Sequence, residues 1–183
     1  KLSEFATVIS FQKDDYKPEY LSGHPDVFLF QYRNNIVIAP EIEKFADMNL
    51  SVLKCTKSKG YSKVDADYPG CTAYNAAIGD TIFIHNLQFT DKAVESLTAG
   101  MRRINVKQGF SRCSTIHLGK DCFITSDKSI MKSLDSAGIE CEYLSPEGII
   151  LKGCRHGLLG GTAGVLGDKL FLCGNADFYP EGT

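Results

Sequence analysis

The chain has 183 residues, of which 43% are hydrophobic and 23% charged, and its formal net charge is −2 at pH 7. That length suits one domain with an ordinary core. The small net charge provides no field that would attract nucleic acid or an anionic membrane surface. No apolar stretch approaches the ~20 residues that cross a bilayer. We therefore expect a single domain over residues 1–183, with neither nucleic acid nor a membrane as a partner.

Cysteine usage indicates the compartment. Seven cysteines are present, an odd number, and no two are spaced as C-x-x-C. In a chain of this length, such usage argues against a disulfide framework and against a structural zinc site. The sequence does not open with a secretory signal pattern, so we expect a cytoplasmic protein. We expect no metal and no other cofactor. Cys122 and Cys173 occupy similar places in apolar strands and are predicted to be small buried residues.

A hairpin pattern recurs four times along the chain. Each copy is an apolar or small-residue stretch, a turn rich in Gly, Asn or Asp, and a second apolar strand; the copies cover 25–40, 72–86, 111–126 and 160–174. Residues 33–35, 79–80 and 167–168 supply turns that tolerate positive φ, as tight hairpins require. Repetition at about 40–50 residues is typical of radial or solenoid architectures.

Helical segments are predicted between the hairpins. The first, 41–53, would place Ile42, Phe45, Met48 and Val52 on one face. The second, 91–103, has Thr90 or Asp91 as its N-cap, and the third, 127–137, starts at Ser126 or Asp127 and ends before Gly138.

The remaining pieces complete a repeated unit. Residues 103–106 and 139–144 are predicted to be short strands, and the polar stretch 57–68 is predicted to be an irregular loop. Each unit then reads hairpin, helix, strand, with units starting near residues 23, 70, 109 and 156. The predicted fold class is α/β, a radial α/β propeller. Its fourth unit is expected to be incomplete in this chain, because residues 175–183 supply no helix.

In a radial array, equivalent positions of successive units converge on one axis. The residues that open the four hairpins are His24 and Asp26, Tyr74 and Asn75, Arg112 and Cys113, and Thr162 and Ala163. A thiol, an imidazole, a carboxylate and an amide at one end of a ring could form an acid/base or nucleophilic site. The sequence therefore places a candidate site at the axis.

Structural roles compete with functional ones at these positions. Lys107 and Arg112 beside Cys113 would lower the pKa of its thiol and favour the thiolate, whereas the alternative is a buried structural thiol. Asp26 could cap a turn, and Asn75 could serve a structural hydrogen bond. The glycines after His156 could form an anion-binding nest or allow tight packing. His85 and His117 are predicted to be ordinary core or surface histidines.

The repeats resemble the pentein fold of guanidino-group-modifying enzymes. Four stretches, 23–26, 73–77, 106–114 and 156–164, are similar to signature segments of a clostridial-type family of unknown function assigned to that fold. The resemblance covers most of the chain from Gly23 onward. It implies five repeated units around a pseudo-five-fold axis.

In catalytic penteins a Cys thiolate attacks the guanidinium carbon and a His acts as acid/base. Carboxylates bind the guanidinium nitrogens. The resemblance implies Cys113 as the nucleophile, His24 as the acid/base and Asp26 as the guanidinium anchor. Tyr74, Asn75, Arg112 and Thr162, which also open hairpins, are predicted to be ligand-binding residues. The sequence departs from the enzymes, whose nucleophile belongs to the last unit, where this chain has Thr162 and Ala163.

Two functional hypotheses follow. The first is a Cys-dependent hydrolase that acts on a small guanidino or amino-acid-like molecule in an axial polar pocket. The second is a non-catalytic ligand-binding or scaffolding protein on the same fold, and the absence of a Cys where the fourth hairpin opens favours it. Neither hypothesis implies an oligomeric state.

Overall fold

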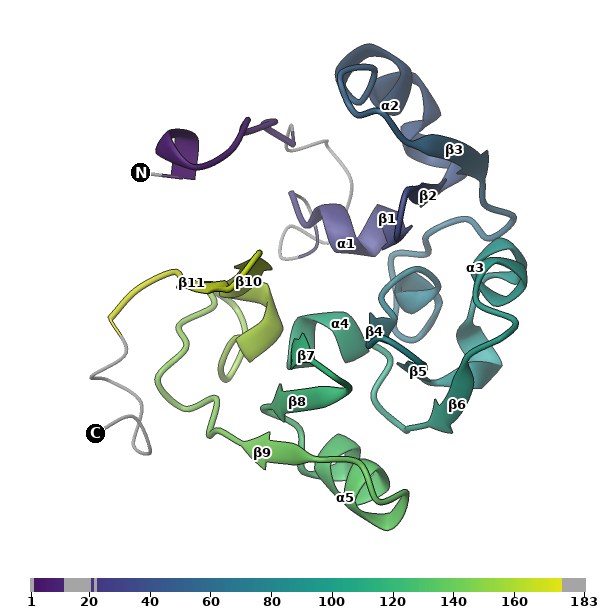
Figure 1. The fold of residues 1–183 in the computed structure, drawn as a ribbon. Helices are drawn as coiled ribbons and strands as arrows, with labels where there is room; N and C mark the ends of the chain where they lie inside the picture. The colour runs from purple at the N-terminus through teal and green to yellow at the C-terminus, as the bar shows by residue number, and fades with distance from the viewer. Residues whose placement is uncertain (1, 12–20, 22, 176–183) are drawn as a thin grey trace.

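A computed structural model describes residues 2–11, 21 and 23–175. In this part of the chain, three three-stranded sheets and one two-stranded hairpin follow one another around a common centre, and no barrel closes (Figure 1). The domain is therefore of the mixed α/β type, built from several small sheets. None of its described helices has the length and apolar character needed to span a bilayer.

The first two units have the same order of elements. The first contains the helical turn α1 (Pro25–Phe28), strands β1 (Leu29–Tyr32) and β2 (Asn35–Ile38), the 3-10 turn η2 (Pro40–Ile42), helix α2 (Glu43–Asn49) and strand β3 (Thr56–Lys59). The second contains η3 (Gly70–Thr72), β4 (Ala77–Ile78), β5 (Ile82–His85), η4 (Leu87–Phe89), α3 (Lys92–Leu97) and β6 (Arg102–Asn105).

The third unit repeats this order and the fourth repeats its beginning. The third contains α4 (Ser111–Ser114), β7 (Thr115–Gly119), β8 (Cys122–Thr125), α5 (Lys128–Ser136) and β9 (Cys141–Tyr143). The fourth contains η5 (Leu159–Gly161), β10 (Ala163–Leu166) and β11 (Lys169–Leu172). A further turn, η1 (Leu2–Glu4), lies at the N-terminus.

Strand pairing is the same in each complete unit. The first two strands form an antiparallel hairpin, and the third lies parallel to the second after a helical crossover. The four predicted hairpins are confirmed, with turn residues such as Arg33 (φ 52°) and Gly167 (φ 62°) in the left-handed region. The crossover helices α2, α3 and α5 lie on the outside of the ring, and the first strand of each hairpin lies toward its centre (Figure 1).

The start of each unit differs from the prediction of a continuous strand. A helical turn precedes every hairpin, at α1, η3, α4 and η5. In α1 the cause is local, because Pro25 occupies the first helical turn, where its fixed φ fits and its missing N–H leaves no unsatisfied donor. Asp26, Arg112 and Cys113, which were expected at strand entries, therefore lie on helical turns.

The helix predictions vary in accuracy. Helix α5 is confirmed, with Asp127 accepting from the backbone N–H groups of Ser129 and Ile130 and Gly138 following at φ 70°. Helix α2 is shorter than 41–53, and the predicted face is wrong in part, because Met48 is 79% exposed and Leu50 is buried instead.

Two predictions about polar segments and cysteines are corrected. Strand β3 (Thr56–Lys59) lies in what was expected to begin an irregular loop, and it pairs in parallel with β2. Its four residues are all polar and three of them are exposed, which an edge strand tolerates. Cys173 is exposed and Cys122 is half-buried, so neither is a core residue, while all seven cysteines are free thiols.

Three buried apolar clusters hold the units together. The largest includes Phe28, Val37 and Phe83 and so joins the first two sheets. Within it Phe30 and Phe83 are in edge-to-face contact, with ring centroids 6.1 Å apart. A second cluster under α5 joins the second and third sheets, and a third, small cluster around Ile116 and Leu159 joins the third unit to η5.

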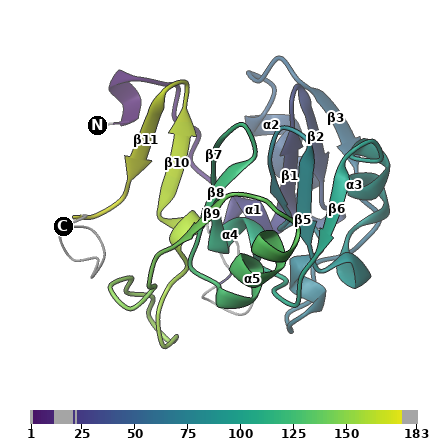
Figure 2. The same ribbon diagram turned by 60° about the horizontal axis from the view of Figure 1, so that its bottom comes forward.

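The N-terminal segment contacts both the first and the fourth unit. Phe5 contacts Phe171 of β11, with ring centroids 5.5 Å apart. Phe11 contacts Phe28 and Phe45 of the first unit, at 5.9 and 4.9 Å. Figure 2 shows this segment crossing beside the β10–β11 hairpin. The described N-terminal residues thus connect the fourth unit with the first through aromatic contacts.

Candidate functional site

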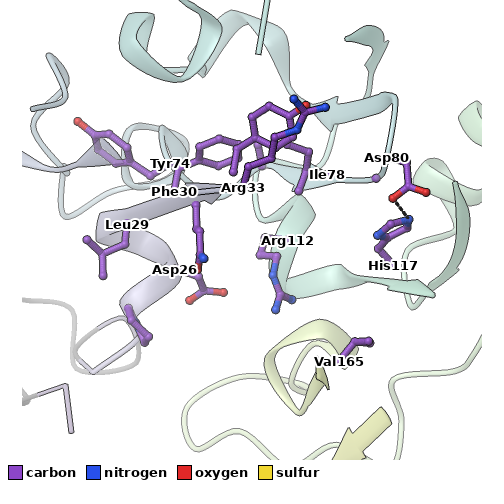
Figure 3. A pocket seen from close by; sticks show the side chains of 15 residues that line it. Asp26, Leu29, Phe30, Arg33, Tyr74, Ile78, Asp80, Arg112, His117 and Val165 are labelled. Atoms are coloured by element: carbon purple, nitrogen blue, oxygen red, sulfur yellow. Dashed lines mark ion pairs between the residues drawn. The ribbon is translucent and has the colours of Figure 1, made fainter. Parts of the chain in front are cut away.

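A polar cavity of about 880 Å³ lies at the centre of the ring. The first strand of every hairpin contributes to its wall, through Phe30 of β1, Ile78 of β4, His117 of β7 and Val165 of β10 (Figure 3). Its ionisable side chains come from three units: Asp26, Arg33, Asp80, Arg112 and His117. We call it the central polar cavity.

A second cavity of about 350 Å³ is mostly apolar. Its wall includes Val27, Phe110 and Ile149 together with His24 and Cys113, and we call it the apolar cavity. Asp26 lines one cavity, and its neighbours His24 and Cys113 line the other. The cluster of these three side chains therefore lies in the wall between the two cavities.

The three predicted catalytic residues are in mutual proximity. The Cys113 thiol donates a hydrogen bond to Asp26 Oδ2 over 2.8 Å, and His24 Nδ1 lies 4.0 Å from Asp26 Oδ1. One polar atom from each residue falls within 4.8 Å of the other two. Two helical turns position them, α1 for Asp26 with His24 just before it, and α4 for Cys113. The expectation that residues far apart in sequence meet here is confirmed.

Of the two alternatives for Cys113, the structure agrees with the buried thiol and not with the thiolate. Burial of the side chain, which is 5% exposed, raises the pKa of the Cys113 thiol well above its usual value, and the Asp26 carboxylate raises it further. The hydrogen bond from Asn75 and the nearby Arg112 act in the opposite direction but are weaker. Cations near residue 113 were expected to favour a thiolate; instead the resting group is a neutral thiol that donates to a carboxylate.

Asn75 connects the first, second and third units. Its side-chain amide donates to the backbone carbonyl of Asp26 (3.1 Å) and to Cys113 Sγ (3.2 Å), and its Oδ1 accepts from the backbone N–H of Cys113 (3.1 Å). The residue is fully buried. Its amide is thus committed to the framework, and the role it plays is to orient Cys113 and Asp26.

The other three predicted ligand-binding residues have different surroundings. Tyr74 is in the wall of the central polar cavity, but its hydroxyl donates to Ser62 O over 2.6 Å, and burial raises its pKa above the usual range. Arg112 lines the same cavity, with Nη1 donating to Gly160 O over 3.1 Å. Thr162 lines the apolar cavity, where its hydroxyl donates to Leu159 O over 2.8 Å.

The glycine-rich stretch after His156 serves close packing at Gly160. A Cβ there would meet the backbone carbonyl oxygens of Arg112, Cys113 and Thr115, with that of Thr115 at 2.7 Å. Glycine therefore allows η5 to lie directly against α4. This contact places the fourth unit against the residues of the site.

Three ionisable residues of the central polar cavity, Asp80, Arg33 and His117, were not predicted as site residues. Asp80 lies at the tip of the second hairpin, 3.7 Å from His117 Nε2 of β7, and Arg33 at the tip of the first hairpin lies over the ring of Tyr32 (Figure 3). Only the residues that open the hairpins were predicted to line a site. Arg33 and Asp80 each lie in a hairpin turn, two residues before the second strand. This shared position is the sequence pattern from which both could have been predicted.

Among the described residues, His24, Asp26 and Cys113 form the one group of metal-ligating side chains close enough to share an ion. The site thus offers a thiol and an imidazole on the apolar side, and two guanidinium and two carboxylate groups, that of Asp26 included, on the polar side.

Comparison with known proteins yields one match. No curated protein and no solved structure matches the chain. A family model, described as a family of unknown function (DUF6873), matches residues 1–183, and the chain therefore belongs to that family.

Proposed function

We propose that this protein is a pentein-like domain that binds a small amino-acid-like or guanidino molecule in its central polar cavity. The radial arrangement of like units around a centre supports the fold assignment (Figure 1). The observation that carries the function is that carboxylates and guanidinium groups from separate units line one cavity. Seven free thiols suit a reducing, cytoplasmic setting.

The cationic end of the ligand would lie against carboxylates. Asp26 is 24% exposed and Asp80 is 59% exposed, and both line the cavity. Asp26 Oδ2 already accepts the Cys113 thiol, which leaves Oδ1 for a ligand donor. Carboxylates bind guanidinium and ammonium groups through charge-assisted hydrogen bonds.

The anionic end of the ligand would lie against Arg112. One of its N–H groups is held by Gly160 O, which orients the guanidinium without neutralising it. Asp26 and Arg112 both line this cavity (Figure 3), and no ion pair joins them among the residues the structure describes. A zwitterion could therefore bridge the two charges. The cavity volume falls within the range of roughly 300–1,000 Å³ that small-molecule sites occupy.

The binding test is calorimetric titration of the metal-free protein with L-arginine, a probe that carries both charges. Arg112→Ala and Asp26→Asn should each weaken binding by roughly 10- to 100-fold, because each removes a charged hydrogen-bonding partner. Agmatine, which lacks the carboxylate, should be insensitive to Arg112→Ala.

Two variants serve as matched controls. Arg102 also donates to a backbone carbonyl, that of Ala137, and Asp47 is an exposed carboxylate on α2, but neither lines the cavity. Arg102→Ala and Asp47→Asn should bind L-arginine like the parent protein. Equal binding by Arg112→Ala and the parent, or no binding by either, would refute the proposal.

A Cys-dependent hydrolase is the second candidate, and the proximity of Cys113, His24 and Asp26 favours it. The Cys113 sulfur would attack the guanidinium carbon after losing its proton to His24, the amine would leave with a proton, and water would then release the product. The raised pKa of Cys113 opposes this chemistry in the resting state. Turnover of simple guanidines that Cys113→Ala abolishes would establish it; turnover that persists in Cys113→Ala would exclude Cys113 as the nucleophile.

A further inference from the structure

The cluster in the wall between the two cavities combines three donor atoms of different chemistry. Asp26 Oδ2 lies 2.8 Å from Cys113 Sγ, and Asp26 Oδ1 lies 4.0 Å from His24 Nδ1. All three groups have a ligating atom within 4.8 Å of the others. Tetrahedral zinc with bonds of about 2.0–2.3 Å separates its donor atoms by roughly 3.3–3.8 Å. Small side-chain adjustments would therefore bring the donors around one ion.

We propose that His24, Asp26 and Cys113 bind a Zn²⁺ ion. A thiolate and an imidazole favour zinc over magnesium or calcium, which prefer sites made of oxygen atoms alone. Three protein ligands leave one tetrahedral position for water or a ligand atom, as in catalytic rather than structural zinc sites. The sequence spacing gives no hint of this site, because its ligands come from two different units.

Charge balance at the site favours the ion. When zinc binds, the Cys113 S–H bond breaks, its proton leaves to solvent, and the sulfur lone pair forms the Zn–S bond. The ion, the thiolate and the Asp26 carboxylate then sum to zero charge, whereas without the ion the cluster carries the uncompensated carboxylate. Because Cys113 is 5% exposed, a thiolate neutralised by the ion avoids the desolvation cost that a lone buried thiolate would carry.

The surroundings already position two of the ligands. The Asn75 amide donates to Cys113 Sγ over 3.2 Å, while the same side chain accepts from the Cys113 backbone N–H over 3.1 Å and donates to Asp26 O over 3.1 Å. Hydrogen bonds of this kind fix the orientation of metal ligands and tune their donor strength. His24 is 37% exposed, so the ion has access from solvent.

This inference goes beyond the proposed ligand binding, but the two share Asp26. A zinc ion on Asp26 would occupy the carboxylate that we assign to the cationic end of a ligand. Zinc and L-arginine should therefore compete, whereas an anionic or neutral ligand could take the open position on the ion. The two proposals are tested by different observables.

The test is titration of the metal-free full chain with Co²⁺, which replaces zinc in such sites and reports a bound thiolate by charge-transfer absorption in the near ultraviolet. We expect this absorption to saturate at about one ion per chain, to be abolished by added Zn²⁺, and to disappear in Cys113→Ser. His24→Ala should weaken Co²⁺ binding at least about 10-fold. Cys173→Ser, which alters an exposed thiol, should retain the parent spectrum.

Two outcomes would overturn the site: no thiolate charge-transfer band in the parent protein, or a band that Cys113→Ser leaves unchanged. Because Cys113 is buried, circular dichroism must show that its variant is folded. His24→Ala, which changes a partly exposed side chain, provides the same test without altering the core. Failure of L-arginine to bind the metal-free protein, with the Co²⁺ band present, would reject the ligand proposal alone; the converse result would reject the zinc site alone.

Discussion

Cys113 and Asp26 are 87 residues apart in the sequence, yet the thiol of one donates a 2.8 Å hydrogen bond to the carboxylate of the other. The bond joins α4 of the third unit to α1 of the first. It is possible because the helical turns that open the units converge, and because Asn75 of the second unit contacts both residues. The same bond holds the sulfur in its protonated form.

The first prediction concerns thiol reactivity. Cys113 is buried and protonated, whereas Cys154 and Cys173 are exposed. Alkylation requires an accessible thiolate, so Cys113 in the native, metal-free protein should react with iodoacetamide at least about 10-fold more slowly than the two exposed cysteines. Mass spectrometry of timed samples measures each site. In denaturant the three rates should converge, and fast native labelling of Cys113 would contradict the structure.

The site could be predicted from sequence to the extent that it follows from the repeats. Aligning the hairpins on their turns placed His24, Asp26, Asn75 and Cys113 together, and the structure brings them together. Their functional roles remain predictions. The protonation state of Cys113 could not be predicted, because the neighbours that set it are distant in sequence and the flanking cations are not the dominant influence.

The errors in the fold have local physical causes. Helix α2 buries Ala46 and Leu50 rather than Met48, since a chain with several apolar faces offers more than one helical stripe and tertiary packing selects among them. Strand β3 was missed because its polar residues lie on an edge, where pairing with β2 rather than hydrophobicity defines the strand. The repeated hairpin pattern predicted the units correctly, whereas local propensity did not predict where α2 and β3 begin and end.

A second prediction tests Asn75 as the connection between units. Asn75→Ala removes hydrogen bonds to Asp26 O, Cys113 Sγ and Cys113 N, leaving buried polar groups without partners. The free energy of unfolding should fall by about 2–4 kcal/mol. Urea denaturation monitored by circular dichroism measures the change.

Asn49→Ala is the matched control for this measurement. The Asn49 amide makes one hydrogen bond, to Phe45 O within its own helix. Its loss should cost less than about 1 kcal/mol. If Asn75→Ala and Asn49→Ala are equally stable, Asn75 does not hold the units together.

A third prediction compares two adjacent glycines. A Cβ on Gly160 would press on the backbone carbonyls of Arg112, Cys113 and Thr115, whereas a Cβ on Gly161 would meet nothing within 4 Å. Gly160→Ala should therefore destabilise the protein by at least about 2 kcal/mol, because backbone atoms cannot move aside as a flexible side chain can. Gly161→Ala should remain within about 0.5 kcal/mol of the parent. Thermal and urea denaturation measure both, and similar losses would rule out the close contact of η5 with α4.

The last prediction concerns His85, which is fully buried at the end of β5. Its Nδ1 lies 2.8 Å from Thr90 Oγ1 and its Nε2 lies 3.0 Å from Gly109 O. A neutral ring with the proton on Nε2 donates to the carbonyl and accepts the Thr90 hydroxyl. Burial therefore lowers the pKa of His85 from 6.5 to about 4.

The folded-state pKa of His85 lies below its unfolded value, so the unfolded chain binds more protons between these two values. The stabilisation from the neutral ring is complete above about pH 6.5 and is lost as pH falls toward about 4, a difference on the order of 3 kcal/mol. In His85→Gln this contribution is absent, so the free energy of unfolding should fall less steeply between pH 7 and pH 4.5 than in the parent. Urea denaturation across that range measures both slopes. Identical slopes would mean that His85 accepts its proton in the folded protein as readily as in the unfolded chain, which the buried hydrogen bonds to Thr90 and Gly109 do not permit.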